Sequence, residues 1–362
     1  MSTIPASILP VKDGAVGIVS FVYDDGFMDT CLHLGQLFER YGLLGNIAMI
    51  GKHFADVAAV DDAGQYTFTH TPEQRQKIED FRRFFEDYPR FQIISHSMTH
   101  RAFGFDEENL RRETVAPQQL FRQIFPGQDV LSYAYPGFAD DGTREAQFRA
   151  AVPFLAQAYI AVRGVTTGLP QPLAQLDPAY PINTCSTRQV TELYTSADKR
   201  TKDAIMASAS VGGWTVITSH NITDELSEIP FYVTKAYYQT LIDFVYPFIA
   251  SGRLWCAYFT DAVQYLTERD NASLTAVYDE ASQRISLTLT HTLDREKFFY
   301  PLTVRVTLPP EWHADSVRLQ AADRRGQRMD REVTVESGEG GRSVTVNLTP
   351  NQGAATLTPI GA

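Results

Sequence analysis

The chain has 362 residues, which is more than a single domain usually holds, so its length favours two domains. With 44% hydrophobic and 21% charged residues, it has the composition of a soluble globular protein. The formal net charge of −11 argues against a nucleic acid or an anionic membrane as partner, because both need a basic surface. A neutral sugar substrate is compatible with this charge.

Cysteine content and terminal patterns give few further constraints. The three cysteines, Cys31, Cys185 and Cys256, include no CxxC pair, so neither a disulfide framework nor a cysteine zinc site is expected. No apolar stretch is long enough to span a bilayer, and residues 1–10 lack the pattern of a secretion signal. We expect a cytoplasmic protein, or a secreted or periplasmic one whose signal has been removed. The sequence makes no prediction of oligomeric state.

Strands and helices alternate over roughly the first 270 residues. Residues 16–22 form an apolar, β-branched run that predicts a buried strand. Further strands are expected at 45–50, 91–94, 129–135, 158–162, 214–218 and 254–259. Helices are expected at 30–41, 71–88, 106–125, 146–155, 201–210, 231–248 and 261–268, with a polar insertion at 51–70 and a loop at 164–190. The pattern predicts an α/β fold with a parallel sheet or a (β/α) barrel, whose strand carboxyl ends carry the chemistry.

The hydrophobic pattern of the sequence changes after Asn271. Short runs with period-two alternation are separated by turns such as 337–341. This pattern predicts a small C-terminal antiparallel β-sandwich. We therefore expect a catalytic domain over residues 1–270 and a β-sandwich accessory domain over 271–362, which packs against the first rather than binding ligand.

Two histidines, His96 and His100, follow the expected strand at 91–94. If the chain becomes helical at Ser95, these two side chains lie on one helix face, one turn apart. Two imidazoles so placed can bind one divalent metal ion, which needs at least one further protein ligand and an open position for water. The pair therefore predicts a metal site at the end of this strand.

Two adjacent carboxylates, Asp24 and Asp25, end the first buried strand. Carboxylates in such a place are costly unless they serve a purpose. The alternative is an Asp-Gly turn, with Asp29 capping the next helix. Pro136, Arg163 and His220 also follow expected strands, so all these residues are predicted to share one edge of the sheet.

These groups together suit the hydrolysis of an amide or ester. A metal held by two histidines and one aspartate lowers the pKa of bound water towards about 7. A second carboxylate can take the proton of the water, and a histidine can protonate the leaving group. The metal and a backbone N–H can stabilise the developing oxyanion, by about 3 kcal/mol per well-placed donor.

The motifs resemble those of polysaccharide deacetylases, the NodB-homology domain of carbohydrate esterase family four. Tyr23-Asp24-Asp25-Gly26 is similar to the family's T/S-F-D-D-G motif, and His96-Ser97-Met98-Thr99-His100 matches H-[ST]-x-x-H. Ile217-Thr218-Ser219-His220 resembles L-x-x-H. The ordered set covers about residues 15–270 and implies a distorted (β/α) barrel of the polysaccharide deacetylase type.

The resemblance also implies roles for these residues. Asp24 would be the catalytic base, His220 the general acid, and Asp25, His96 and His100 the ligands of one divalent metal. Zinc suits two histidines and one aspartate, and nickel or cobalt would also fit.

The third motif of the family, R-x-P-[YF]-G, is only partly present, around Tyr135, Pro136 and Gly137. Ala134 stands where the family usually has arginine, and Gly137 where it often has an aromatic residue. The missing arginine normally pairs with the base; Arg163 can supply that charge, or it forms an ordinary surface ion pair. We expect Gly137 N–H to serve as the oxyanion donor, with Pro136 and Tyr135 beside the substrate.

The sequence thus predicts a metal-dependent deacetylase acting on an N-acetylated, less readily an O-acetylated, saccharide. Two alternatives remain open. The altered third motif is compatible with an amidohydrolase of the same superfamily that acts on a small non-sugar amide. The chain is otherwise a non-catalytic carbohydrate-binding protein, although the presence of both aspartates and all three histidines argues against that.

Overall fold

The computed structural model describes residues 1–101, 103–136, 143–166, 168–174, 176, 182–187, 196–229, 231–338 and 341–360. Contacts within the chain divide it into two units. The barrel unit holds residues 17–173 and 177–262, and the sandwich unit holds residues 1–16, 174–176 and 263–362. No helix of the described part of the chain is long and apolar enough to cross a membrane.

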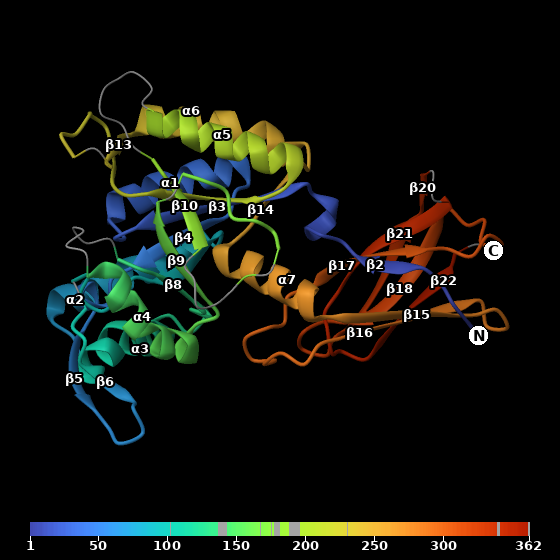
Figure 1. Ribbon diagram of the computed structural model, residues 1–362, viewed down its shortest axis with the longest axis horizontal. Coiled ribbons are helices and arrows are strands. Elements are labelled where there is room, and N and C mark those ends of the chain that lie inside the picture. Colours follow the sequence, from blue (N-terminus) through green and yellow to red (C-terminus); the bar gives the residue numbers. More distant parts are fainter. Residues whose placement is uncertain are drawn as a thin grey trace. The chain divides into compact units, whose positions relative to one another are not determined.

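The barrel unit is built on a parallel sheet that is nearly closed on itself (Figure 1). Its strand order is β11-β10-β9-β8-β7-β4-β3-β14, and β11 pairs with β3 as well, which brings the two ends of the sheet together. The strands are β3 (Gly17–Asp24), β4 (Gly45–Met49), β7 (Phe91–Ser95), β8 (Ser132–Ala134), β9 (Ala161–Thr166), β10 (Ile182–Ser186), β11 (Trp214–Ser219) and β14 (Leu254–Cys256). The predicted α/β fold with a distorted (β/α) barrel is confirmed.

Helices connect these strands. They are α1 (Met28–Tyr41), α2 (Pro72–Asp87), α3 (Glu107–Ile124), α4 (Arg144–Ala158), α5 (Ser196–Val211) and α6 (Lys235–Ala250). α2 begins close to the expected position, with a capping box in which Thr71 and Gln74 exchange side-chain and backbone hydrogen bonds. The alternative in which Asp29 caps α1 is not found: Phe27 occupies the N-cap position without a side-chain bond, and Asp29 lies in the first turn.

The expected polar insertion at 51–70 and the expected loop at 164–190 both contain strands. Residues 51–70 include the η2 turn (Gly51–His53) and a hairpin of β5 (Asp56–Val60) and β6 (Tyr66–Thr69). β10 lies within the expected loop at 164–190 and pairs in parallel with β9 and β11. Its sequence, Ile-Asn-Thr-Cys-Ser, has little apolar character, so its two neighbours rather than its own pattern make it a strand.

Buried polar contacts tie the barrel strands together. Trp214 is buried, packs against the ring of Phe259 at 5.0 Å, and donates its indole N–H to Ser20 Oγ at 3.1 Å. Ser132 Oγ and Thr260 Oγ1 lie 2.9 Å apart in the same core. Such bonds satisfy polar groups that close packing has removed from water.

The sandwich unit contains two antiparallel sheets. One has the order β1-β15-β16-β22-β18-β19, and the other β2-β17-β21-β20. The strands are β1 (Ser2–Thr3), β2 (Ala6–Ile8), β15 (Ser273–Asp279), β16 (Arg284–Thr290), β17 (Leu302–Thr307), β18 (Ser316–Ala322), β19 (Arg328–Thr334), β20 (Glu336–Gly338), β21 (Gly341–Leu348) and β22 (Ala354–Pro359). The predicted antiparallel β-sandwich is confirmed.

The expected boundary at residue 270 did not anticipate the N-terminal strands. β1 pairs with β15 and β2 with β17, so the first 16 residues belong with the sandwich. Each of these strands is only two or three residues long, and their pairing partners lie far along the chain. Sequence alternation over so few residues carries no signal. The unit also includes most of α7 (Phe259–Asn271) and the η1 turn (Lys12–Gly14).

A buried carboxyl, Glu268, lies within the sandwich unit. One of its oxygens accepts a hydrogen bond from Tyr300 N at 2.8 Å, and the other lies 3.1 Å from His291 Nε2. Asn351 Nδ2 lies 3.3 Å from His291 Nδ1, which favours the tautomer that donates from Nε2 to Glu268. Burial raises the pKa of Glu268 to about 8.

This raised pKa predicts that the protein loses stability as the pH rises. The folded state holds a proton on Glu268 that the unfolded chain releases at about 4.3, so stabilisation is complete below pH 4.3 and is lost as the pH rises to 8. Urea unfolding between pH 5 and 8 should show a fall of a few kcal/mol at most. The Glu268→Gln variant, which carries no charge at any of these pH values, should show a flatter dependence. Equal slopes for both proteins would contradict this account.

Candidate functional site

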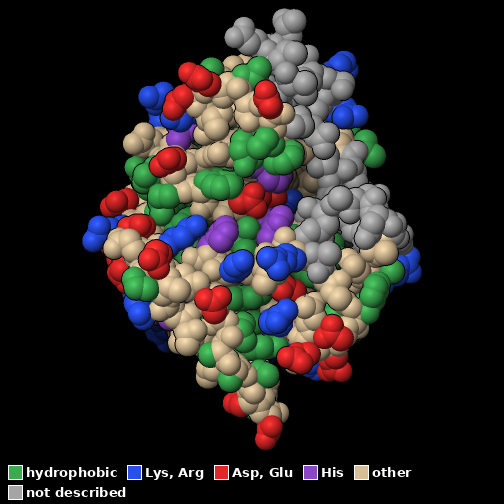
Figure 2. Space-filling model, turned by 90° about the vertical axis from the view of Figure 1, so that its left-hand side faces the viewer, with side chains coloured by type: hydrophobic (Ala, Val, Ile, Leu, Met, Phe, Trp, Pro, Cys, Tyr) green, Lys and Arg blue, Asp and Glu red, His purple; other side chains and the backbone are tan. Residues whose placement is uncertain are grey.

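Four parallel strands bring charged side chains to one edge of the barrel. β3 ends with Asp24, His96 follows β7, and His220 follows β11. Arg163 lies on β9. Figure 2 shows histidine and acidic side chains together near the centre of this face of the molecule. Because the strands are parallel, their carboxyl ends meet at the same edge, as the sequence analysis predicted.

The turn after β3 sets the direction of the second aspartate. Asp25 has φ 73° and Gly26 has φ 66°, so two successive residues lie in the left-handed region. A non-glycine residue in that region is uncommon and costs free energy, which points to a constraint at this position. The Asp-Gly turn is present, and the functional interpretation of the two aspartates stays a prediction.

The two histidines do not lie on a helix, so the helical arrangement considered at Ser95 is not the one that brings them together. Residues 96–100 form an irregular loop in which Ser97 and His100 have φ values of 63° and 56°. Ser97 Oγ accepts a hydrogen bond from His100 N at 2.8 Å, which holds the loop in a tight turn. The loop still brings the two rings together, with their centroids 4.7 Å apart.

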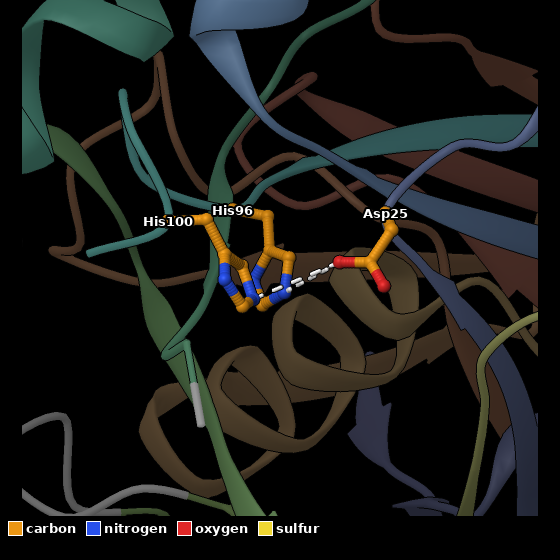
Figure 3. Close-up of side chains that lie close together, drawn as sticks. All are labelled: Asp25, His96 and His100. Carbon is orange, nitrogen blue, oxygen red and sulfur yellow. Dashed lines mark ion pairs between the residues drawn. The ribbon is translucent and has the colours of Figure 1, made fainter. Parts of the chain in front are cut away.

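Asp25, His96 and His100 converge on one point (Figure 3). Asp25 Oδ1 lies 3.8 Å from His96 Nε2 and 3.7 Å from His100 Nε2. Ligand atoms about 2.1 Å from a tetrahedral zinc ion lie about 3.4 Å apart, so these distances nearly fit. Both Asp25 Oδ1 and His96 Nε2 are buried without a hydrogen-bond partner among the described residues. The three side chains are placed to bind a metal ion.

The state of His96 suits metal binding. Its Nδ1 lies 2.8 Å from the backbone carbonyl of Ala134, to which a protonated Nδ1 donates. Burial lowers the pKa of His96 to about 3, so the ring is neutral at pH 7 and Nε2 offers a lone pair towards Asp25. A backbone acceptor on the far nitrogen is the usual means of fixing a metal-binding imidazole.

Asp24 lies beside this group in a different environment. It is 2% exposed, and its Oδ2 accepts a hydrogen bond from Arg163 Nη2 at 2.8 Å. His220 Nε2 lies 3.7 Å from the same oxygen. Burial alone would raise the pKa of Asp24, but the adjacent Arg163 charge, aided by the histidines, lowers it below its usual value. Oδ1 has no partner in the described part of the chain, so a carboxylate oxygen is available at the site.

Asp25 shows the opposite shift. Burial, together with the neighbouring Asp24 charge, raises the pKa of Asp25. Two adjacent carboxyls thus have pKa values pushed apart by their surroundings, a pattern that often marks functional sites.

Arg163 is buried, with 4% of its surface exposed, so its ion pair with Asp24 is not an ordinary surface pair. Its other terminal nitrogen lies 3.4 Å from Thr218 Oγ1. Ala134, at the position of the missing motif arginine, contributes its backbone carbonyl to His96 instead. The arginine charge thus reaches Asp24 from the next strand.

Removing Arg163 is expected to destabilise the fold strongly. Arg163→Met leaves a buried carboxylate unpaired, which typically costs about 3–5 kcal/mol. The matched control is Arg90→Met, since Arg90 pairs with Glu39 at 3.4 Å on the surface and should contribute at most about 1 kcal/mol. Urea unfolding of both variants measures the difference. Equal small losses would mean that Arg163 acts as a surface ion pair.

The expected oxyanion and substrate residues are only partly described. Gly137 lies outside the described residues. Pro136 and Tyr135 are buried, and the ring of Tyr135 packs edge-on against Phe103 and Phe148, each at 5.3 Å. A tyrosine packed on both sides is placed as a core residue, so its expected contact with substrate stays a prediction.

The sequence analysis missed Glu113, which is hydrogen-bonded to the loop of residues 96–100, here called the histidine loop. It is 2% exposed on α3, and its carboxylate accepts hydrogen bonds from Thr99 N at 2.8 Å and Thr99 Oγ1 at 2.9 Å. Thr99 immediately precedes His100. A lone glutamate in the middle of an amphipathic helix gives no sequence signal, because such residues usually face solvent.

Glu113→Ala is therefore expected to weaken metal binding. The Thr99 backbone N–H loses its charged acceptor, so His100 loses a fixed position; losing such a supporting contact typically reduces metal affinity 10- to 100-fold. Glu107→Ala is the matched control, since Glu107 lies on the same helix and pairs with Arg111 on the surface. Zinc affinities are compared by competition with a chromophoric chelator. Equal affinities for the two variants would remove Glu113 from this role.

His53 lies close to the histidine loop. It is half-buried, and burial, aided by the nearby Lys77 and His100 charges, lowers its pKa to about 4. The η2 turn that carries it is bound to the histidine loop, because Gly51 N donates to Ser97 O and Lys52 N to Met98 O. A side chain on Gly51 would come within 2.6 Å of Met98 Sδ, so glycine permits this close approach.

Known structures share this architecture. Agd3, a carbohydrate deacetylase, matches over 95% of this chain and 65% of its own, with 10% identity and a TM-score of 0.51. A protein described as a polysaccharide deacetylase from Mycobacterium smegmatis matches over 74% of this chain and 96% of its own, with 15% identity and a TM-score of 0.47. The match to Agd3 shows that the chain has the fold of a carbohydrate deacetylase, as the motifs indicated.

Sequence comparison adds one curated relative. A gellan lyase from a Bacillus species is 26% identical over 297 residues, which cover 75% of this chain. The chain spans about a tenth of the length of that relative, 11%, so the match concerns one part of a much larger protein. No family model matches the chain.

Proposed function

We propose that this chain is a metal-dependent hydrolase that removes acetyl groups, mainly N-acetyl groups, from a saccharide. The observation that carries the proposal is the convergence of Asp25, His96 and His100 beside Asp24. In this proposal Asp25, His96 and His100 hold the metal, and zinc suits two nitrogens and one oxygen, with nickel or cobalt as alternatives. Deacetylases among the proteins of similar fold support an acetylated sugar as substrate.

The two remaining titratable groups suit the proton transfers of amide hydrolysis. The bound metal would supply a water of lowered pKa and polarise the carbonyl. Asp24, held as a carboxylate by Arg163, would take the proton of the attacking water at its free Oδ1. His220 would donate a proton to the leaving amine from the opposite side, and its Nε2 lies 3.7 Å from Asp24 Oδ2. Gly137 N–H remains our proposed oxyanion donor.

Acetate release tests the proposal directly. The wild-type protein is incubated with N-acetylated and O-acetylated oligosaccharides, with added zinc and with chelator. Zinc-dependent acetate release supports the proposed function.

Two other outcomes separate the alternatives. Metal bound at one ion per chain, with acetate released from no sugar, would favour a small non-sugar amide as substrate. Neither metal nor release would favour a carbohydrate-binding protein without catalysis.

A further inference from the structure

A half-exposed aromatic surface adjoins the candidate site. It consists of Phe27, Phe231 and Tyr232. The side chains of Phe27 and Phe231 are each 38% exposed, which is high for phenylalanine. Figure 2 shows hydrophobic side chains gathered beside the histidine and acidic side chains on this face. Exposed apolar surface of this kind marks places where a ligand or partner binds.

The three rings are continuous with the proposed catalytic groups. The Phe231 ring lies 4.9 Å from the His220 ring, and the Tyr232 ring lies 5.5 Å from that of Phe231. Phe27 contacts Tyr232 edge-on at 6.4 Å and comes two residues after Asp25. The surface therefore begins at the reacting centre.

The segment that carries Phe231 and Tyr232 is anchored at both ends. β12 (Ile222–Thr223) and β13 (Val233–Thr234) form a two-stranded parallel ladder that closes it. Thr30 Oγ1 on α1 donates a hydrogen bond to Asn221 Oδ1 at 2.6 Å and accepts one from Ile222 N at 3.1 Å. The start of the segment is therefore bound to the helix that follows Phe27. Tyr232 N also donates to Ile229 O at 2.9 Å. The aromatic surface is held in place before any ligand arrives.

We propose that Phe27, Phe231 and Tyr232 form a binding surface for the sugar rings next to the acetylated unit of an oligosaccharide. This inference rests on the proposed function. A sugar ring presents a flat face of C–H groups that packs well on an aromatic face, and its hydroxyls stay in water beside it. A preformed aromatic surface binds with little loss of side-chain freedom. The formal net charge of −11 disfavours an anionic membrane as the alternative occupant.

The test measures saccharide binding without turnover. Zinc-loaded Asp24→Asn protein serves as the parent, and N-acetylglucosamine oligomers, N-acetylgalactosamine oligomers and O-acetylated xylan oligomers of one to five units are titrated by calorimetry. The parent should bind longer oligomers of at least one series more tightly than the monomer. Phe27→Ala and Phe231→Ala should each raise the Kd for the longer oligomers about tenfold.

Two further variants separate stacking from a structural effect. Phe231→Tyr keeps the aromatic face and should bind within about twofold of the parent. Met206→Ala is the matched control, because Met206 on α5 is 42% exposed and apolar, and its Kd should not change. Phe231→Ala could weaken binding by displacing the adjacent His220 ring. Phe27→Ala tests the surface without this effect, because the ring of Phe27 contacts Tyr232.

The outcomes distinguish this inference from the proposed function. Alanine variants that bind as tightly as the parent would overturn the inference, even if the wild-type protein releases acetate from the same sugars. A parent that binds none of the oligomers would also overturn it. Chain-length-dependent binding that is lost in both alanine variants would support the surface, even if the wild-type protein released no acetate and the proposed activity failed.

Discussion

Asp24→Asn is expected to lower kcat by about 10²- to 10⁴-fold while the protein keeps its metal. The amide cannot accept a proton from water, but it has nearly the same shape and can still accept a hydrogen bond from Arg163 through its oxygen. Asp25, His96 and His100 are untouched by this change. Turnover is measured as acetate release, and metal content by elemental analysis after dialysis. Near wild-type turnover would remove Asp24 as the base.

The ion pair between Asp24 and Arg163 means that Asp24→Asn is also expected to change the stability of the fold. Asparagine carries no charge, so the buried guanidinium loses its counter-ion and the fold should be less stable. A urea titration of Asp24→Asn therefore has to confirm that the protein is folded under assay conditions. Loss of turnover in a folded, metal-containing protein is the informative result.

Asp25→Ala is expected to lose both metal and activity. Two histidines alone bind zinc far more weakly than the set of three, because the carboxylate supplies the negative charge of the group. The measurement is zinc retained after dialysis, together with acetate release at saturating zinc. Full metal occupancy in Asp25→Ala would reverse the proposed roles of the two aspartates. Asp29→Ala is the matched control, since Asp29 lies in the first turn of α1, four residues further on, outside the candidate metal group.

Much of the barrel edge could be predicted because its residues follow strands that are apolar. Asp24 is the last of eight consecutive buried residues in β3, and such an apolar run is visible in the sequence. The alternation of strands and helices then places Asp24, His96 and His220 at one edge, whatever the exact ends of the elements. The motif spacing of His96 and His100 also pointed to a shared metal, although the local backbone is a loop rather than a helix.

The supporting contacts could not be predicted, because they join residues that are distant in sequence and ordinary in type. Arg163 reaches Asp24 across 139 positions, and nothing in the sequence says that it is buried. Glu113 looks like any surface glutamate on an amphipathic helix, and Phe231 like any apolar residue of a helix start. Their roles depend on which loops come together at the barrel edge, which is a property of tertiary structure.

The pairing of the first strands with the sandwich has a consequence for synthesis and folding. Ile8 on β2 pairs with Val304 on β17, and Thr3 on β1 with Val277 on β15. The barrel unit is therefore an insertion within the sandwich unit. During synthesis β1 and β2 are made first, and their partner strands emerge only after the whole barrel unit. The chain between each strand and its partner is long, and closing so long a loop slows strand pairing. We expect the barrel to form first and the sandwich to close around the chain's two distant segments last.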